Sequence, residues 1–203
     1  MSKEQLSQIV SRETMIKLEH YVQLLECWNK SVNLVSSKSI EEIWQRHIYD
    51  SAQLVSYLSS SKTIIDLGAG AGFPGLVLAM IGSWDVTLIE SDTKKCSFLK
   101  EVARQTNTQV TIVNQRIETL VPWQVDVVTV RALAPLEKLL GYASPFLQER
   151  GVGIFLKGKM LEEEIEQARL AWSFDAEVIK SKTSCEGRVI KVKDIKQLSG
   201  EKN

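Results

Sequence analysis

The sequence predicts an α/β fold, in which a mostly parallel sheet with helices on both faces follows a helical extension and ends in an antiparallel hairpin. Three observations predict it. From residue 63 onward, short apolar runs alternate with helical patterns, as in parallel sheets that are buried on both faces. Before residue 61, apolar residues recur at spacings of three and four. Near the end, two apolar runs are only a few residues apart, which is typical of a hairpin.

The N-terminal residues 1–61 are expected to form a helical extension that packs on the core domain, residues 62–203. A second helix is expected over residues 40–58, capped by Ser37 or Ser39. The polar run 59–61 then separates the two regions. The helical pattern before residue 30 is carried by Leu18, Tyr21, Val22, Leu25 and Trp28.

Seven strands are expected in the core domain. Five of them are short apolar runs at residues 63–67, 85–90, 109–113, 125–130 and 152–156. Helical patterns fill most of the gaps, at residues 76–81, 94–105, 136–147 and 161–171. The last two strands, residues 176–181 and 188–193, form the expected hairpin around Gly187.

Composition restricts the class of protein. The 203 residues suffice for one domain with a small extension, and 25 basic residues balance 25 acidic ones, so no global basic field attracts nucleic acid. No apolar run approaches the ~20 residues of a membrane span, and the first residues lack the apolar core of a signal peptide. Cys27, Cys96 and Cys185 are too scattered for a zinc site or a disulfide framework. We expect a cytoplasmic monomer without a metal ion or membrane contact.

The most informative stretch is the glycine loop, residues 66–75, which follows the first expected strand. It reads D-L-G-A-G-A-G-F-P-G, with glycines at 68, 70 and 72 and with Pro74 at the expected helix start. Glycine allows a sharp turn and lets a ligand lie against bare peptide. The loop therefore predicts a cofactor-binding turn between a strand and a helix.

Two cofactors fit the glycine loop. Gly70-x-Gly72-x-x-Gly75 matches the dinucleotide fingerprint, with Glu90 20 residues after Gly70. S-adenosyl-L-methionine is favoured because the glycine run begins directly after the strand and because the chain ends in a hairpin that nicotinamide-binding domains do not need. Asp66 at the strand end would also repel a pyrophosphate but suits a cofactor with an ammonium and a sulfonium group.

Glu90 ends the second strand, where an acidic side chain accepts hydrogen bonds from ribose hydroxyls. Together with the hairpin, these features predict a class I methyltransferase, which has a Rossmann-like, mostly parallel seven-stranded sheet. Asp66, Gly68, Gly70 and Glu90 are thus the predicted cofactor-binding residues.

The sequence resembles the RsmG family, also called glucose-inhibited division protein B, over nearly its whole length. The motifs that carry the resemblance are, in chain order, Trp28-Asn29 with Asn33-Leu34, Arg46-His47 with Asp50-Ser51, the glycine loop with its Phe73-Pro74, Glu90 to Lys95 with Phe98-Leu99, Val130 to Ala132, and Lys157-Gly158. The family's usual Thr after Asn-Leu is Val35 here, which puts only local packing in doubt.

This resemblance implies methyl transfer from S-adenosyl-L-methionine to N7 of one guanine near the decoding region of 16S ribosomal RNA, with free RNA or the small ribosomal subunit as partner. It also implies that Gly68 and Phe73 contact the cofactor, that Ile117 and Glu118 flank its adenine, and that Arg131 lies beside the site. Independently of the resemblance, Arg131 follows the fourth expected strand, and strand ends are where open α/β sheets bind ligands. Arg131 is the candidate catalytic residue.

Other candidates and alternatives stay open at this stage. His47 is expected to position other groups, since N7 of guanine has a free lone pair and needs no base. The basic residues of the tail, between Lys180 and Lys202, are candidates for phosphate contacts. A small-molecule methyltransferase or a nicotinamide-dependent oxidoreductase would share the glycine loop.

Overall fold

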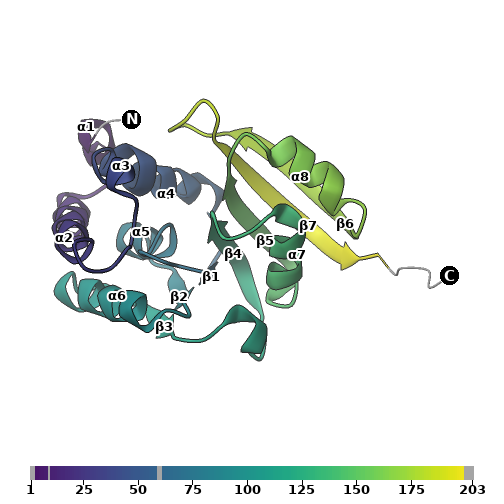
Figure 1. Ribbon diagram of the computed structural model, residues 1–203, viewed down its shortest axis with the longest axis horizontal. Coiled ribbons are helices and arrows are strands. Elements are labelled where there is room, and N and C mark those ends of the chain that lie inside the picture. Colours follow the sequence, from purple (N-terminus) through teal and green to yellow (C-terminus); the bar gives the residue numbers. More distant parts are fainter. Residues whose placement is uncertain (1–2, 9, 59–60, 199–203) are drawn as a thin grey trace.

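A computed structural model describes residues 3–8, 10–58 and 61–198 (Figure 1). Its strands form one sheet of seven, in the order β3-β2-β1-β4-β5-β7-β6. The first five are parallel, and β7 runs antiparallel to both β5 and β6. This confirms the predicted sheet and its final hairpin. The strands are β1 (Thr63–Leu67), β2 (Asp85–Ile89), β3 (Thr111–Val113), β4 (Val125–Arg131), β5 (Leu147–Lys157), β6 (Trp172–Lys180) and β7 (Arg188–Gln197).

Helices cover both faces of the sheet. Before β1 lie α1 (Lys3–Ser7), α2 (Arg12–Trp28), α3 (Ser37–Ile40), the π-helical turn η1 (Trp44–Tyr49), α4 (Asp50–Ala52) and the 3-10 turn η2 (Gln53–Tyr57). Within the sheet region lie α5 (Gly75–Ile81), α6 (Thr93–Gln105), the 3-10 turn η3 (Ile117–Thr119), α7 (Leu136–Ala143) and α8 (Leu161–Ala168). Among the described residues, no helix is long and apolar enough to cross a membrane.

The core consists of two hydrophobic clusters, one on each face of the sheet. Successive residues of β1 point to opposite faces, so Ile64 belongs to one cluster and Ile65 to the other. The first cluster joins the sheet to α2, α5 and α6, and the second joins it to α7 and α8. Both faces are therefore buried, which explains the continuous apolar runs of the strands.

The N-terminal helices pack directly on the core. Helix α2 begins at a Ser11 cap, whose hydroxyl accepts a hydrogen bond from the Thr14 N–H at 3.0 Å. Its fully buried Leu18 and Tyr21 share a cluster with Phe98 of α6. The division of the chain at residue 61 stays a prediction, because residues 59–60 lie outside the described ones.

Several predicted helix limits were wrong. Ser36, not Ser37 or Ser39, caps α3, since its hydroxyl accepts a hydrogen bond from the Ser39 N–H at 3.3 Å. The single helix expected over residues 40–58 is a series of α, π and 3-10 turns, which a short apolar pattern does not distinguish. Helices α7 and α8 end at Ala143 and Ala168, because β5 and β6 already begin at residues 147 and 172.

Candidate functional site

The glycine loop requires glycine for two separate reasons. Gly68, Gly70 and Gly72 have φ angles of 68°, 57° and 98°, which disfavour residues with a side chain. A Cβ atom at Gly68 would also lie 2.7 Å from Leu133 Cδ1. At Gly70 the space is open, because a Cβ there would meet only the carbonyl oxygen of Gly68, at 3.8 Å. A ligand can therefore lie against the bare peptide of Gly70.

Asp66 lies behind the glycine loop and lines neither of the two pockets described below. It is buried, because strand alternation places it on the same face as Ile64, toward α5. Its carboxylate accepts hydrogen bonds from the Gly75 N–H and the Thr129 hydroxyl, both at 2.9 Å. Burial raises its pKa to about 7, although these hydrogen bonds oppose the rise. The structure thus places Asp66 at the start of α5, where it fixes the helix that follows the loop.

Glu90 connects the end of β2 to the glycine loop. Its Oε2 accepts a hydrogen bond from the Gly70 N–H at 2.9 Å, and its Oε1 accepts one from the Asp92 N–H at 2.8 Å. The side chain is nearly buried, yet it lines a pocket. Each carboxylate oxygen has a second lone pair, so Glu90 can hold the loop and still accept a hydrogen bond from a ligand.

The pocket that Glu90 lines has a volume of about 380 Å³ and lies beyond the carboxyl ends of β1, β2 and β4. We call it the smaller pocket, because a larger one adjoins it. Six of the eight predicted site residues line the smaller pocket: Gly68, Gly70, Glu90, Ile117, Glu118 and Arg131. Asp66 and Phe73 do not. Sequence reasoning missed several of its lining residues, among them Tyr142 of α7, whose hydroxyl donates a hydrogen bond to Glu118 Oε1 at 2.7 Å. A tyrosine in an ordinary helical pattern gave no signal for this role.

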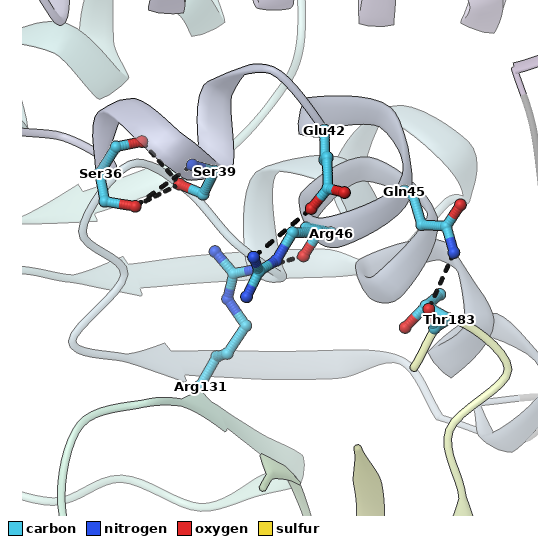
Figure 2. A network of polar contacts seen from close by, with 7 residues as sticks. All are labelled: Ser36, Ser39, Glu42, Gln45, Arg46, Arg131 and Thr183. Carbon is cyan, nitrogen blue, oxygen red and sulfur yellow. Dashed lines mark hydrogen bonds and ion pairs between the residues drawn. The ribbon is translucent and has the colours of Figure 1, made fainter. Parts of the chain in front are cut away.

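Arg131 ends β4 in a half-buried position. Its guanidinium carbon lies 4.8 Å from the centre of the Phe73 ring, a cation–π contact. Its Nη1 donates a hydrogen bond to the carbonyl oxygen of Arg46 at 3.1 Å, and Figure 2 shows the side chain reaching toward that carbonyl. Burial lowers the pKa of Arg131, and the nearby Asp50 carboxylate opposes this change. The side chain is therefore held by packing and by a backbone contact.

Phe73 supports Arg131 from within the core. It is buried, and it lines neither this pocket nor the larger one described below. The His47 ring stacks on it with centroids 4.9 Å apart, and Tyr21 packs at 5.3 Å. The His47 ring nitrogens have no hydrogen-bond partner among the described residues. Burial and, to a smaller extent, the charges of Arg131 and Arg46 lower the His47 pKa to about 3, so the imidazole is neutral.

A larger pocket of about 830 Å³ adjoins the smaller one. Arg131 and Ala132 line both pockets. The other walls come from η1 and α4, from the end of β5, and from the loop between β6 and β7, which we call the hairpin loop (residues 181–187). The charged residues that line it are Glu42, Arg46, Asp50, Lys157, Lys159, Glu164, Glu186 and Arg188.

Hydrogen bonds fasten the hairpin loop to the N-terminal helices. Gln45 Nε2 donates to the Thr183 carbonyl oxygen at 2.9 Å, a contact that Figure 2 shows. Gln53 Oε1 accepts from the Lys182 N–H at 2.9 Å. The Thr183 hydroxyl donates to Asp50 Oδ1 at 2.5 Å. Sequence reasoning missed this loop, because its partners are about 130 residues away and no local spacing connects them.

A largely buried ion pair fixes the segment that follows Arg131 and Ala132. Lys157 Nζ lies 2.6 Å from Glu164 Oε2 and donates to the Ala134 carbonyl oxygen at 2.9 Å. The same Glu164 oxygen accepts a hydrogen bond from the Leu136 N–H at 2.6 Å. Lys157 belongs to the Lys157-Gly158 motif at the end of β5, but the sequence indicated no role for it. The structure gives it one: it orders residues 134–136, next to Arg131.

The basic tail is partly neutralised. Lys191 pairs with Glu177 at 2.7 Å, and Arg188 lies 3.6 Å from Glu162. Lys202 lies outside the described residues. The remaining basic residues of the tail are exposed, namely Lys180, Lys182, Lys193 and Lys196. A role in phosphate binding stays a prediction.

Comparison with known proteins gives one consistent result. Residues 14–192 match the family model described as GidB, rRNA small subunit methyltransferase G. Ribosomal RNA small subunit methyltransferase G of Paramagnetospirillum magneticum is 46% identical over 187 residues, which are 92% of this chain and 91% of the relative. That of Gluconobacter oxydans is 46% identical over 93% of this chain and 98% of the relative.

Solved structures support the fold. The chain is similar to M. jannaschii TYW2 in complex with AdoMet, with a TM-score of 0.59 and 19% identity over 75% of this chain and 76% of that one. It is also similar to a ribosomal protein L11 methylase from Lactobacillus delbrueckii subsp. bulgaricus, with a TM-score of 0.58 and 16% identity over 70% of this chain and 75% of that one. These likenesses confirm the class I methyltransferase fold.

Proposed function

The chain belongs to the rRNA small subunit methyltransferase G family, and we propose that it transfers the methyl group of S-adenosyl-L-methionine to N7 of one guanine in 16S ribosomal RNA. The observation that carries this proposal is the pair of pockets that meet at Arg131. One pocket is suited to the methyl donor and the other to a base. A group transfer needs its two reactants to be held in a fixed orientation relative to each other, and two pockets that share a wall can hold them in this way.

The smaller pocket fits S-adenosyl-L-methionine. Gly70 offers open space and an exposed peptide, and the Glu90 carboxylate has lone pairs for ribose hydroxyls. Ile117 gives an apolar surface for the adenine, and Glu118 is held beside it by the Tyr142 hydroxyl. Asp66 and Phe73 act indirectly, the first through α5 and the second through Arg131.

The larger pocket is the site for the acceptor guanine. Its walls combine cationic and anionic side chains, which suits a polar base attached to a phosphate backbone. Arg131 presents a planar guanidinium, which can donate to O6 of guanine. Because Arg46 and Phe73 already hold this side chain, little rotamer freedom is lost when the base binds.

When bound, S-adenosyl-L-methionine supplies an electrophilic methyl group. The residues of the chain align the base with it: Glu90 and the glycine loop hold the donor, and Arg131 holds the base. N7 carries its own lone pair, so no residue has to remove a proton. His47 agrees with this, because a neutral imidazole with a pKa of about 3 is a poor base. Its contact with Phe73 supports a positioning role.

The two alternative functions from the sequence analysis are less well supported. A small-molecule methyltransferase would share the glycine loop but not the match over residues 14–192. A nicotinamide-dependent oxidoreductase would share only Gly70-x-Gly72-x-x-Gly75. The test is incubation of the protein with S-adenosyl-L-methionine labelled in its methyl group, together with either small ribosomal subunits or free 16S RNA. Label should enter the RNA, and label found only in small molecules would contradict the proposal.

A further inference from the structure

One carboxylate oxygen on the wall of the larger pocket is free. Asp50 is half-buried and lines this pocket. Its Oδ1 accepts hydrogen bonds from Gln53 Nε2 at 2.7 Å, from the Thr183 hydroxyl at 2.5 Å and from the Ser181 hydroxyl at 3.4 Å. No donor among the described residues bonds to Oδ2. The carboxylate is thus fixed through one oxygen while the other remains available.

Burial and the neighbouring groups act in opposite directions on the Asp50 carboxyl. Burial raises its pKa, but the hydrogen bonds from Thr183, Ser181 and Gln53 and the nearby charge of Arg131 oppose the rise. Arg131 stands on the wall of the same pocket. An ionised carboxylate only accepts hydrogen bonds, so Oδ2 selects for a donor on whatever fills the pocket.

Guanine carries such a donor on the side away from its methylation site. N7 and O6 are acceptors on one edge, and the 2-amino group is a donor on another. A carboxylate bound to the amino group leaves N7 free to react. Arg131 can then serve O6, so that the base is held at two points by groups of opposite charge.

We propose that Asp50 is a specificity-determining residue whose free Oδ2 accepts a hydrogen bond from the 2-amino group of the acceptor guanine. This inference rests on the proposed function. Adenine has no amino group at this position, and neither does hypoxanthine, the base of inosine. With either base the hydrogen bond from the 2-amino group to this charged oxygen would be lost. The hairpin loop contributes by fixing the carboxylate through Thr183.

The test compares two substrates that differ only in this amino group. A 16S RNA is assembled by ligation with either guanosine or inosine at the nucleotide that the wild-type protein methylates. Inosine keeps N7 and O6. The wild-type protein should methylate the inosine substrate with a kcat/KM about ten- to hundredfold lower, the range expected for a hydrogen bond to a charged group.

Asp50→Asn should remove the discrimination between guanosine and inosine and still keep the hydrogen bonds that fix the side chain, which we call the anchor. Asn keeps one carbonyl oxygen for Thr183 and Gln53 but presents an amide donor in place of Oδ2. The kcat/KM of the Asp50→Asn variant for the guanosine substrate should fall nearly to its kcat/KM for the inosine substrate. Thr183→Val is the matched control, because it loosens the anchor and leaves the carboxylate. Thr183→Val should keep a preference for guanosine, and Thr183→Ser should restore wild-type kinetics.

Two kinetic outcomes would overturn the inference: equal kcat/KM values of the wild-type protein for the two substrates, or an Asp50→Asn variant that discriminates as well as the wild type. Hydrogen exchange of the hairpin loop shows whether Asp50→Asn has kept the loop in place. Binding of guanosine and inosine monophosphates gives a readout that needs no methyl transfer. If the wild-type protein methylates no ribosomal RNA, the proposed function fails. A preference for the guanosine nucleotide that Asp50→Asn abolishes would still support the role of Asp50, and equal binding would contradict it.

Discussion

Glu90 accepts a hydrogen bond from the backbone N–H of Gly70 at 2.9 Å. Glu90, which follows β2, therefore holds the glycine loop, which follows the neighbouring strand β1. The space at Gly70 is open, and the loop has φ angles that only glycine adopts readily. The proposed cofactor site therefore depends on a tertiary contact as much as on the glycine motif.

Glu90→Ala should weaken the binding of S-adenosyl-L-methionine by about ten- to hundredfold, because a hydrogen bond to a charged group contributes roughly 1.5–3 kcal/mol. The variant loses a ribose acceptor and also releases Gly70 and Asp92. Isothermal calorimetry measures the effect. The matched control is Glu101→Ala, which removes a half-buried carboxylate on α6 that pairs with Arg104. An unchanged dissociation constant for Glu90→Ala would show that Glu90 does not bind the cofactor.

Arg131→Ala should keep most of the affinity for S-adenosyl-L-methionine and lose most of the methyl transfer. Orientation of the base acts in the transition state, so the loss should be in kcat. Arg131→Lys should rescue poorly, because an ammonium lacks the planar guanidinium fork. Arg104→Lys on α6 is the matched control. Equal losses of cofactor affinity and turnover in Arg131→Ala would place Arg131 at the cofactor alone.

The raised pKa of Asp66 predicts a pH dependence of stability. Burial raises this pKa from 3.8 to about 7, with Gly75, Thr129 and Arg131 opposing the rise and Glu90 adding to it. Because the folded pKa exceeds the unfolded one, the folded state binds the proton more tightly. This contribution is complete below the unfolded value of 3.8 and is lost as the pH rises to about 7.

The free energy of unfolding of the wild type should therefore fall more steeply with pH across this range than that of Asp66→Asn. The variant should also be less stable overall, since its amide nitrogen cannot accept a hydrogen bond. Urea denaturation at a series of pH values measures both effects. Parallel pH profiles for the two proteins would contradict the assignment.

The exposed lysines of β7 predict a salt-dependent contribution to RNA binding. Lys193 and Lys196 are exposed, and neither forms an ion pair with the described residues. If both contact phosphates, replacing both with alanine should reduce the slope of log affinity against log salt by roughly 1.4–1.8. Affinity for the cofactor should not change. Lys191→Ala is the control, because Glu177 already neutralises Lys191. A slope equal to that of the wild type would exclude both lysines from the RNA interface.

Local chemistry made much of the fold predictable. The apolar run of β1, the three glycines and Pro74 identify a strand, a turn and a helix within 13 residues. Arg131 could be placed beside the site, because ligands of parallel sheets bind at the carboxyl ends of the strands. In both cases the signal lies within one element or follows from the order of the elements.

The rest depends on contacts between distant segments. Asp66 was expected beside the cofactor, yet strand alternation turns it toward α5. The contact between Asp50 and Thr183 spans 133 residues, and no pattern in the sequence connects the two. Likewise, Lys157 contacts Ala134 and Glu164 only because β4, β5 and α8 pack together in the fold. Sequence patterns predict the elements, while the pocket walls arise from tertiary packing.

The central claim is methyl transfer to N7 of one guanine, and mapping the modified nucleotide tests it most directly. Unmethylated 16S RNA, free or in small subunits, is incubated with the protein and S-adenosyl-L-methionine. The RNA is then reduced with borohydride and cleaved with aniline, which breaks the chain at 7-methylguanosine. The predicted result is one new cleavage site at a guanine, absent without the cofactor and strongly reduced with Arg131→Ala. Methylation at another base or another atom, or no methylation of the RNA in either form, would contradict the claim.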